Sequence, residues 1–244
     1  MRSGSKRPTT TAACPTGRAG PRRSATPGAR RVDALIRYQV LGGPDTLADL
    51  QHRTRPLALP PDLREGGAVI LLLHAGSVSL AIGQIVASGI PYRLVTNSIS
   101  YGLAYPDRVI DIYNGRANTL LAQMGMALRR RVCVAVAADG PLGKRVDGFE
   151  HKGVEYSIAA GPLVLANLMR ARTYLLVGGH EERSMACRIV EGPPASASLE
   201  TLQAFWGSAI RAEVERLTDL GPENYIQHAI SSVAAMTTRR YRPT

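Results

Sequence analysis

The chain has 244 residues, of which 45% are hydrophobic and 5% aromatic, and its formal net charge is +11. This length allows one large domain or two small ones, with enough apolar side chains for a full core. The scarcity of aromatic side chains argues against a protein that binds single-stranded nucleic acid by base stacking.

The positive charge is concentrated at the start of the chain. Residues 1–31 contain eight Lys and Arg and no acidic residue, which leaves a net charge of +3 for the rest. They contain almost no large apolar side chain, so we predict a disordered basic tail over 1–31 and one folded domain over 32–244. Such a tail would attract an anionic membrane surface or nucleic acid. The alternative interpretation is a dispensable leader.

After the tail, two short helices are expected over Val32–Leu41 and Asp45–Arg53, followed by a proline-rich extended connection. The next stretch, Gly66–Ile90, is apolar and long enough to suggest a transmembrane segment. Polar residues such as His74 and Gln84 interrupt it. We therefore interpret it as a buried strand followed by a buried helix.

From Gly67 onward, predicted strands and helices alternate. The strands are Ala68–Leu73, Tyr92–Val95, Arg108–Tyr113, Val132–Ala137, Tyr174–Val177 and Ala186–Val190. The helices are Ser77–Ser88, Ala117–Arg130, Pro162–Arg170, Leu199–Leu217 and Glu223–Met236, and a glycine-rich loop, with a hairpin as an alternative, covers Asp139–Tyr156. This alternation predicts an α/β fold with a mixed, mainly parallel sheet flanked by helices.

The sequence predicts neither a disulfide framework nor a metal site. An odd number of cysteines without regular spacing, Cys14, Cys133 and Cys187, indicates reduced thiols and a cytoplasmic location. The polar run His180–Glu182 lacks a second group of ligands at helical spacing, so we interpret it as a turn between two strands.

Two strands end in residues that can carry chemistry, at the edge where α/β sheets bind ligands. His74 follows Ala68–Leu73, and its imidazole can take a proton from a hydroxyl near neutral pH. Taken alone, a histidine in this position is more often structural. Asp139 follows the strand Val132–Ala137.

The loop after Asp139 has the composition of an anion-binding loop. Gly140 and Gly143 would let backbone amides approach an anion, and Lys144 and Arg145 could hold a phosphate. A solvated turn is the competing interpretation. A Walker loop is excluded, since Arg145 stands where Ser or Thr should bind magnesium. The chain also lacks the Gly-x-Ser-x-Gly elbow of α/β-hydrolases and the Gly-x-Gly-x-x-Gly fingerprint of dinucleotide folds.

The order of these features resembles a known family. From about Gly67 to Gln227 the chain resembles the lysophospholipid acyltransferase superfamily, and within it the lipid A biosynthesis acyltransferase branch, in which a strand leads into a His-x-x-x-x-acid motif. The segments that carry the resemblance are Ile70-Leu71-Leu72-Leu73-His74-Ala75-Gly76-Ser77, Asp139-Gly140-Pro141-Leu142-Gly143-Lys144, Phe149–Gly153, Ala160-Gly161-Pro162-Leu163 and Pro222-Glu223-Asn224-Tyr225-Ile226-Gln227.

The resemblance implies a fold of the glycerol-3-phosphate acyltransferase type. It also implies transfer of an acyl chain from a thioester, acyl-CoA or acyl carrier protein, to a hydroxyl of a lipid or glycan acceptor, with no bound cofactor. His74 would be the general base, and Lys144 or Arg145 would orient a substrate. The expected location is the cytoplasmic face of a membrane, at an anionic surface, and nucleic acid is not expected as a partner.

One departure from the family motif bears on catalysis, because Ser79 stands where the motif has its acid. Losing the aspartate charge in a Ser–His–Asp system costs about 10⁴ in rate. Three outcomes stay open. Asp139 or Asp111 could supply a carboxylate to His74, Ser79 could act as a neutral orienting group, or the chain could be a catalytically silent homologue that binds an acyl or phospholipid ligand.

Overall fold

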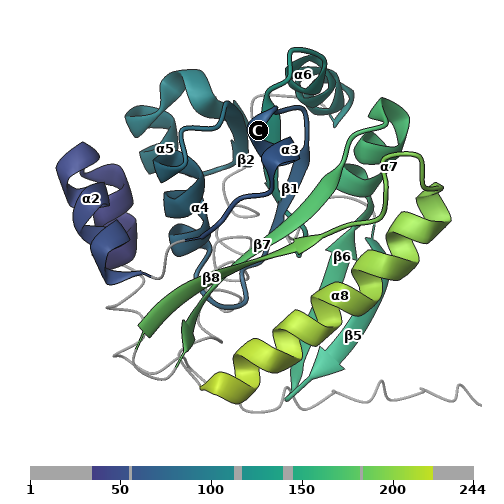
Figure 1. Cartoon of the computed structure of the whole chain (residues 1–244). Coiled ribbons are helices and arrows are strands. Elements are labelled where there is room, and N and C mark those ends of the chain that lie inside the picture. Colours follow the sequence, from purple (N-terminus) through teal and green to yellow (C-terminus); the bar gives the residue numbers. More distant parts are fainter. Residues whose placement is uncertain (1–34, 55–56, 113–116, 140–144, 182–183, 222–244) are drawn as a thin grey trace, which may run out of the picture.

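The computed structural model describes residues 35–54, 57–112, 117–139, 145–181 and 184–221 (Figure 1). Its main sheet has six strands in the order β3-β2-β4-β1-β7-β8. The strands are β1 (Val69–Leu72), β2 (Tyr92–Thr96), β3 (Val109–Asp111), β4 (Cys133–Ala137), β7 (Thr173–Glu181) and β8 (Ser184–Glu191). β8 is antiparallel to β7, and the other pairs are parallel. The predicted α/β fold with a mixed, mainly parallel sheet is therefore confirmed.

Helices cover both faces of this sheet, as Figure 1 shows. On one side lie a helix over 35–41, α2 (Pro44–Arg53), α3 (Pro61–Arg64), α4 (Val78–Ala87) and α5 (Ile99–Ala104), which leads into the short 3₁₀ helix η1 (Pro106–Arg108). On the other lie α6 (Ala117–Arg129), α7 (Ala160–Met169) and α8 (Leu199–Leu220), with a separate hairpin of β5 (Arg145–His151) and β6 (Val154–Ala159). The chain thus builds two apolar layers, one on each face.

The first core strand supplies both layers because alternate side chains of a strand point to opposite faces. Val69 and Leu71 pack in the layer with α6, α7 and α8, whereas Ile70 and Leu72 pack in the layer with α4. All four side chains are buried. This burial on both faces accounts for the uninterrupted apolar run that made Gly66–Ile90 resemble a membrane segment. None of the helices in the described ranges is long and apolar enough to cross a membrane.

Several sequence predictions need correction. The helix α5 was missed, since its six residues carry no amphipathic period. The proline-rich connection contains the short helix α3, and Asp139–Tyr156 is largely the β5–β6 hairpin rather than a loop. The entry helices belong to the core, because Ile36 and Leu50 are buried in it. The basic tail 1–31 and the helix predicted over Glu223–Met236 lie outside the described residues.

The turn after β1 is held by a close approach to β7. Ser77 donates its backbone N–H to the carbonyl oxygen of Gly178 at 2.7 Å, and Ser77 also caps α4 by accepting from the amide of Leu80. Gly76 has a φ of +77°, and a Cβ added to it would overlap the Gly178 oxygen. Glycine is therefore required at Gly76 for two reasons, its left-handed backbone and the lack of space.

We expect Gly76→Ala to lower the free energy of unfolding by about 3 kcal/mol or more, from left-handed strain and overpacking together. The matched control is Gly89→Ala, since Gly89 has a φ of +71° but nothing within 4 Å of an added Cβ. It should cost only about 1–2 kcal/mol, the left-handed strain alone. Urea unfolding of both variants measures the difference, and equal losses would contradict the close approach.

Candidate active site

The register of the sheet brings His74 and Asp139 together. Leu72 of β1 is paired with Ala137 of β4, and the two strands are parallel neighbours. His74 and Asp139 each stand two residues beyond that pair. The backbone N–H of Ala138 still donates to the Leu72 carbonyl at 2.9 Å, so the two chains stay side by side past the formal strand ends. Equal offsets from paired residues therefore place the two side chains at the same point of the carboxyl edge.

The Asp139 carboxylate holds both the ring and the backbone of His74. Its Oδ1 lies 2.9 Å from His74 Nδ1. The backbone N–H of His74 donates to the same carboxylate, at 3.0 Å to Oδ1 and 2.8 Å to Oδ2. The Asp139 side chain is 1% exposed and that of His74 is 21% exposed. The acid is thus enclosed behind the imidazole, and part of the imidazole still reaches solvent.

This contact sets the protonation chemistry of the imidazole. An ionised carboxylate only accepts hydrogen bonds, so Nδ1 carries the proton and Nε2 is left as the acceptor. Burial by itself lowers the pKa of His74, but the charge and hydrogen bond of Asp139 outweigh it and raise the pKa above the ordinary 6.5. A histidine held in this way can accept a proton at Nε2 and keep the resulting imidazolium beside a negative charge.

The other two candidates for the orienting group are not placed to hold the ring. Ser79 is buried in the first turn of α4, and among the described residues His74 makes its hydrogen bonds with Asp139 and none with Ser79. Asp111 ends β3, which is three strands away from β1 in the sheet order. Three strand spacings amount to about 14 Å. The structure therefore brings one carboxylate, Asp139, to His74.

Most of the predicted anion-binding loop cannot be placed. Gly140, Gly143 and Lys144 lie outside the described residues. Arg145 opens β5 with an exposed side chain, and its guanidinium donates to the Ser157 carbonyl at 3.4 Å.

Arg145 nevertheless lies close to the His74–Asp139 pair through the hairpin. It is paired with Ala159 of β6, and Ala159 donates its N–H to the Ala138 carbonyl at 2.7 Å. Ala159 is also the N-cap of α7, so the positive end of that helix lies at the same edge. An exposed cation and a helix N-terminus are thus both anchored one residue away from Asp139.

The remaining polar candidates lie apart from this pair. His180 is on β7, where it is paired with Met185 of β8, and Glu182 is outside the described residues. Cys133 is fully buried in β4 and Cys187 is half-buried in β8. In the part of the chain that the structure describes, no three His, Cys, Asp or Glu side chains gather closely enough to hold a metal ion.

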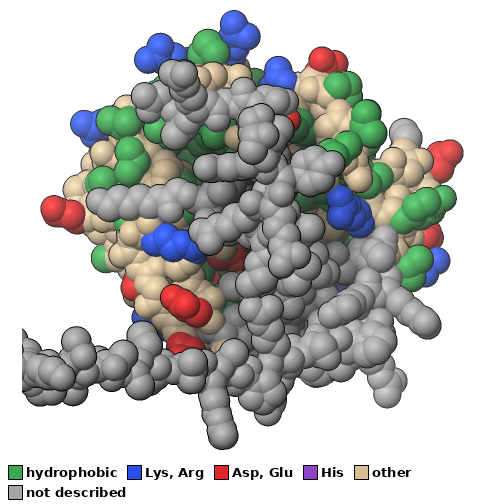
Figure 2. Space-filling view, turned by 180° about the vertical axis from the view of Figure 1, so that it is seen from behind, with side chains coloured by type: hydrophobic (Ala, Val, Ile, Leu, Met, Phe, Trp, Pro, Cys, Tyr) green, Lys and Arg blue, Asp and Glu red, His purple; other side chains and the backbone are tan. Residues whose placement is uncertain are grey.

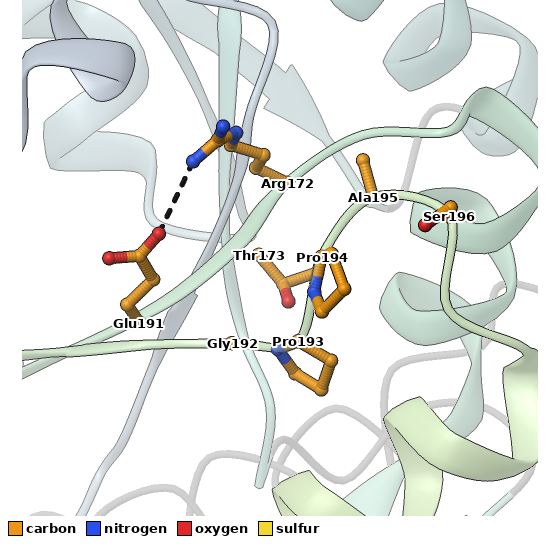
Figure 3. Close-up of a pocket in the computed structure, with 8 residues that line it drawn as sticks. All are labelled: Arg172, Thr173, Glu191, Gly192, Pro193, Pro194, Ala195 and Ser196. Carbon is orange, nitrogen blue, oxygen red and sulfur yellow. Dashed lines mark hydrogen bonds and ion pairs between the residues drawn. The ribbon is translucent and has the colours of Figure 1, made fainter.

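Two surface cavities described for the chain lie away from His74. The larger, of about 490 Å³, is at the amino end of β7, where Arg172 pairs with Glu191 at 3.3 Å and also with Asp62 (Figure 3). Two carboxylates offset the one guanidinium there, so this cavity offers no net positive charge to an anion. The second, of about 460 Å³, is lined by Gly43, Leu47, Val86, Ala104, Tyr105, Pro106, Asp107 and Arg108.

Sequence reasoning missed the residue on β7 that positions the histidine. Gly178 accepts the hydrogen bond of Ser77, and a Cβ at Gly178 would overlap the Ser77 carbonyl oxygen. The signal was present, since Gly178 and Gly179 interrupt an apolar strand, and glycine inside a strand often marks the close approach of another backbone.

No protein-family model matches this chain, and no characterised protein matches it significantly in sequence. The likeness to acyltransferases therefore rests on the motifs quoted above and on their order along the chain.

Proposed function

We propose that the chain is an O-acyltransferase that moves an acyl group from a thioester, acyl-CoA or acyl carrier protein, to a hydroxyl of a lipid or glycan acceptor. His74 is the general base, and Asp139 takes the place of the motif acid that Ser79 lacks. The observation that carries the proposal is the hydrogen bond between His74 Nδ1 and a buried carboxylate at the carboxyl edge of the sheet.

The reaction needs one group that moves a proton twice. Nε2 of His74 removes the proton of the acceptor hydroxyl as the oxygen attacks the thioester carbonyl. The tetrahedral intermediate then collapses, the C–S bond breaks, and the imidazolium returns the proton to the departing thiolate. An ester and a free thiol are the products, and no covalent acyl-enzyme forms. Asp139 fixes the tautomer with Nε2 unprotonated and stabilises the imidazolium between the two proton transfers.

Charged groups next to the pair fit the same reaction. The oxygen of the thioester carbonyl gains negative charge in the transition state, and both possible donors carry phosphate groups. The exposed Arg145 and the N-terminus of α7 are the positive groups anchored beside Asp139 among the described residues. We assign to them the orientation of the donor, together with Lys144 from the loop before β5.

The alternative is a catalytically silent homologue that binds an acyl or phospholipid ligand, and it depends on Ser79 in the motif. The Asp139 carboxylate weakens this alternative, because it provides the charge that the motif acid would give.

The test is turnover of an acyl thioester by the full chain, with thiol release followed by colour and the acylated product identified by mass spectrometry. The proposal predicts thiol release that depends on a hydroxyl acceptor. Release without an acylated product would make the chain a thioesterase. Ligand binding without any release would support the silent homologue.

A further inference from the structure

Exposed apolar side chains gather on two short helices next to the candidate site. Leu35 and Tyr38 on helix 35–41 are 62% and 70% exposed, and Ile99 and Leu103 on α5 are both 79% exposed. We call these four side chains the apolar face. They make up half of the eight large hydrophobic side chains that are exposed in the described ranges. Hydrophobic side chains also reach the surface on the α5 side of the molecule in Figure 2. Clustered exposure of this kind marks an interaction surface.

The two helices form a fixed surface rather than two independent segments. The Arg37 guanidinium donates to Ser98 Oγ at 2.7 Å and lies over the Tyr101 ring at 5.6 Å. The hydroxyl of Tyr105, just after α5, donates to the Val40 carbonyl at 2.5 Å. The exposure of the apolar face is thus built into the packing of the two helices.

This surface lies at the edge of the sheet that carries His74. Val95 of β2 is paired with Val136 of β4, and the next residue of β4, Ala137, is paired with Leu72 of β1. The ends of β2 and β1 are therefore level and two strand spacings apart, about 10 Å. Because α5 begins three residues after β2 ends, its first residue stands at the same edge as His74.

The charge next to the apolar face points to the kind of partner. Arg37 is the one charged residue within helix 35–41 and α5. Three residues before that helix, the basic segment 1–31 ends, with eight Lys and Arg and no acid. An apolar surface joined to a segment of one sign of charge is suited to an anionic bilayer, where apolar side chains enter the acyl boundary and basic side chains contact headgroups.

We propose that the apolar face docks on an anionic phospholipid bilayer, with residues 1–31 supplying the electrostatic attraction. Docking there turns the carboxyl edge of the sheet toward the bilayer, so a lipid hydroxyl could reach His74 with its acyl chains still in the membrane. Only this last consequence rests on the proposed function. Docking itself requires no turnover.

The experiment measures co-sedimentation of the full chain with vesicles of phosphatidylglycerol or of phosphatidylcholine. The double variant Ile99→Asp/Leu103→Asp should lower partitioning onto phosphatidylglycerol vesicles at least tenfold, because two apolar contacts become charges of the same sign as the lipid. The matched control is Leu168→Asp, since Leu168 is 72% exposed on α7. It should partition within about twofold of the wild type.

A second pair on the other helix keeps the test independent of folding. Leu35→Ser/Tyr38→Ser should also weaken partitioning, with the circular dichroism spectrum and melting temperature of the wild type. His74→Ala should bind vesicles as the wild type does, so a failure of the catalytic proposal leaves this measurement intact.

Several results would overturn the docking proposal. The wild type could fail to bind phosphatidylglycerol vesicles, both pairs of variants could bind as tightly as the control, or binding could be equal on phosphatidylcholine. Loss of binding to an acidic carrier protein, with vesicle binding unchanged, would assign the apolar face to a protein partner instead.

Discussion

Asp139→Asn should lower kcat for acyl transfer by about 10⁴, the loss that removing the aspartate charge causes in a Ser–His–Asp system. Asparagine has nearly the same shape, so it can still accept the backbone N–H of His74. It cannot stabilise the imidazolium, and its amide can turn an N–H toward Nδ1 and so favour the wrong tautomer. KM should change much less than kcat, because the carboxylate acts on the imidazole and not on the substrate.

The matched control is Asp111→Asn, the other carboxylate that follows a strand of this sheet. Asp111 lies at the end of β3, three strands from β1, so its replacement should leave kcat within about twofold of the wild type. Similar losses in the two variants would mean a general effect on the fold. Full activity in Asp139→Asn would mean that the carboxylate is only a structural partner of His74.

His74→Ala should remove acyl transfer down to the background rate of the thioester. A general base contributes about 10²–10⁴ to the rate, and here the same imidazole also returns the proton to the thiolate. Adding Asp139→Asn to this variant should cost little more, because the two residues act as one unit. Thiol release followed with an acceptor hydroxyl in excess measures both variants.

The control for this variant is His52→Ala, since His52 is exposed on α2. It should retain wild-type turnover and melting temperature. If the wild type transfers acyl groups and His74→Ala keeps that rate, the histidine is structural and the proposed mechanism is wrong.

Local patterns were enough to predict the architecture of the sheet. The run Ala68–Leu73 predicts a strand buried on both faces, and β1 is buried on both faces. Such runs alternate with helical periods, so the α/β class follows from the sequence alone. The hairpin and α5 were harder, because a short helix without an apolar stripe and a charged, glycine-rich hairpin give weak periodic signals.

The partner of His74 could be predicted only as one of two. Both Asp139 and Asp111 follow strands, and no local pattern states which strand lies beside β1. The order β3-β2-β4-β1 decides it, because β4 is the neighbour and β3 is not. Strand order is a tertiary property that depends on crossovers, which explains why sequence reasoning stopped at two candidates.

The arrangement also explains how Ser79 fits this site. The motif acid of the resembled family comes from the helix that follows the histidine, whereas Asp139 comes from the neighbouring strand and occupies Nδ1. A second carboxylate at Ser79 would be buried close to a carboxylate that is itself buried, and like charges there disfavour each other. Serine at this position is therefore consistent with an acid supplied by β4.

The most direct test of the central claim is the dependence of kcat/KM on pH for a water-soluble acyl thioester, measured from about pH 5 to pH 9. His74 must be neutral to accept a proton, and Asp139 raises its pKa above 6.5. The account predicts that kcat/KM rises with pH through one ionisation with a midpoint above 6.5, and that Asp139→Asn moves the midpoint lower, because burial then acts unopposed. A rate that does not change across this range, or a midpoint that Asp139→Asn leaves in place, would contradict the assignment of His74 as the base held by Asp139.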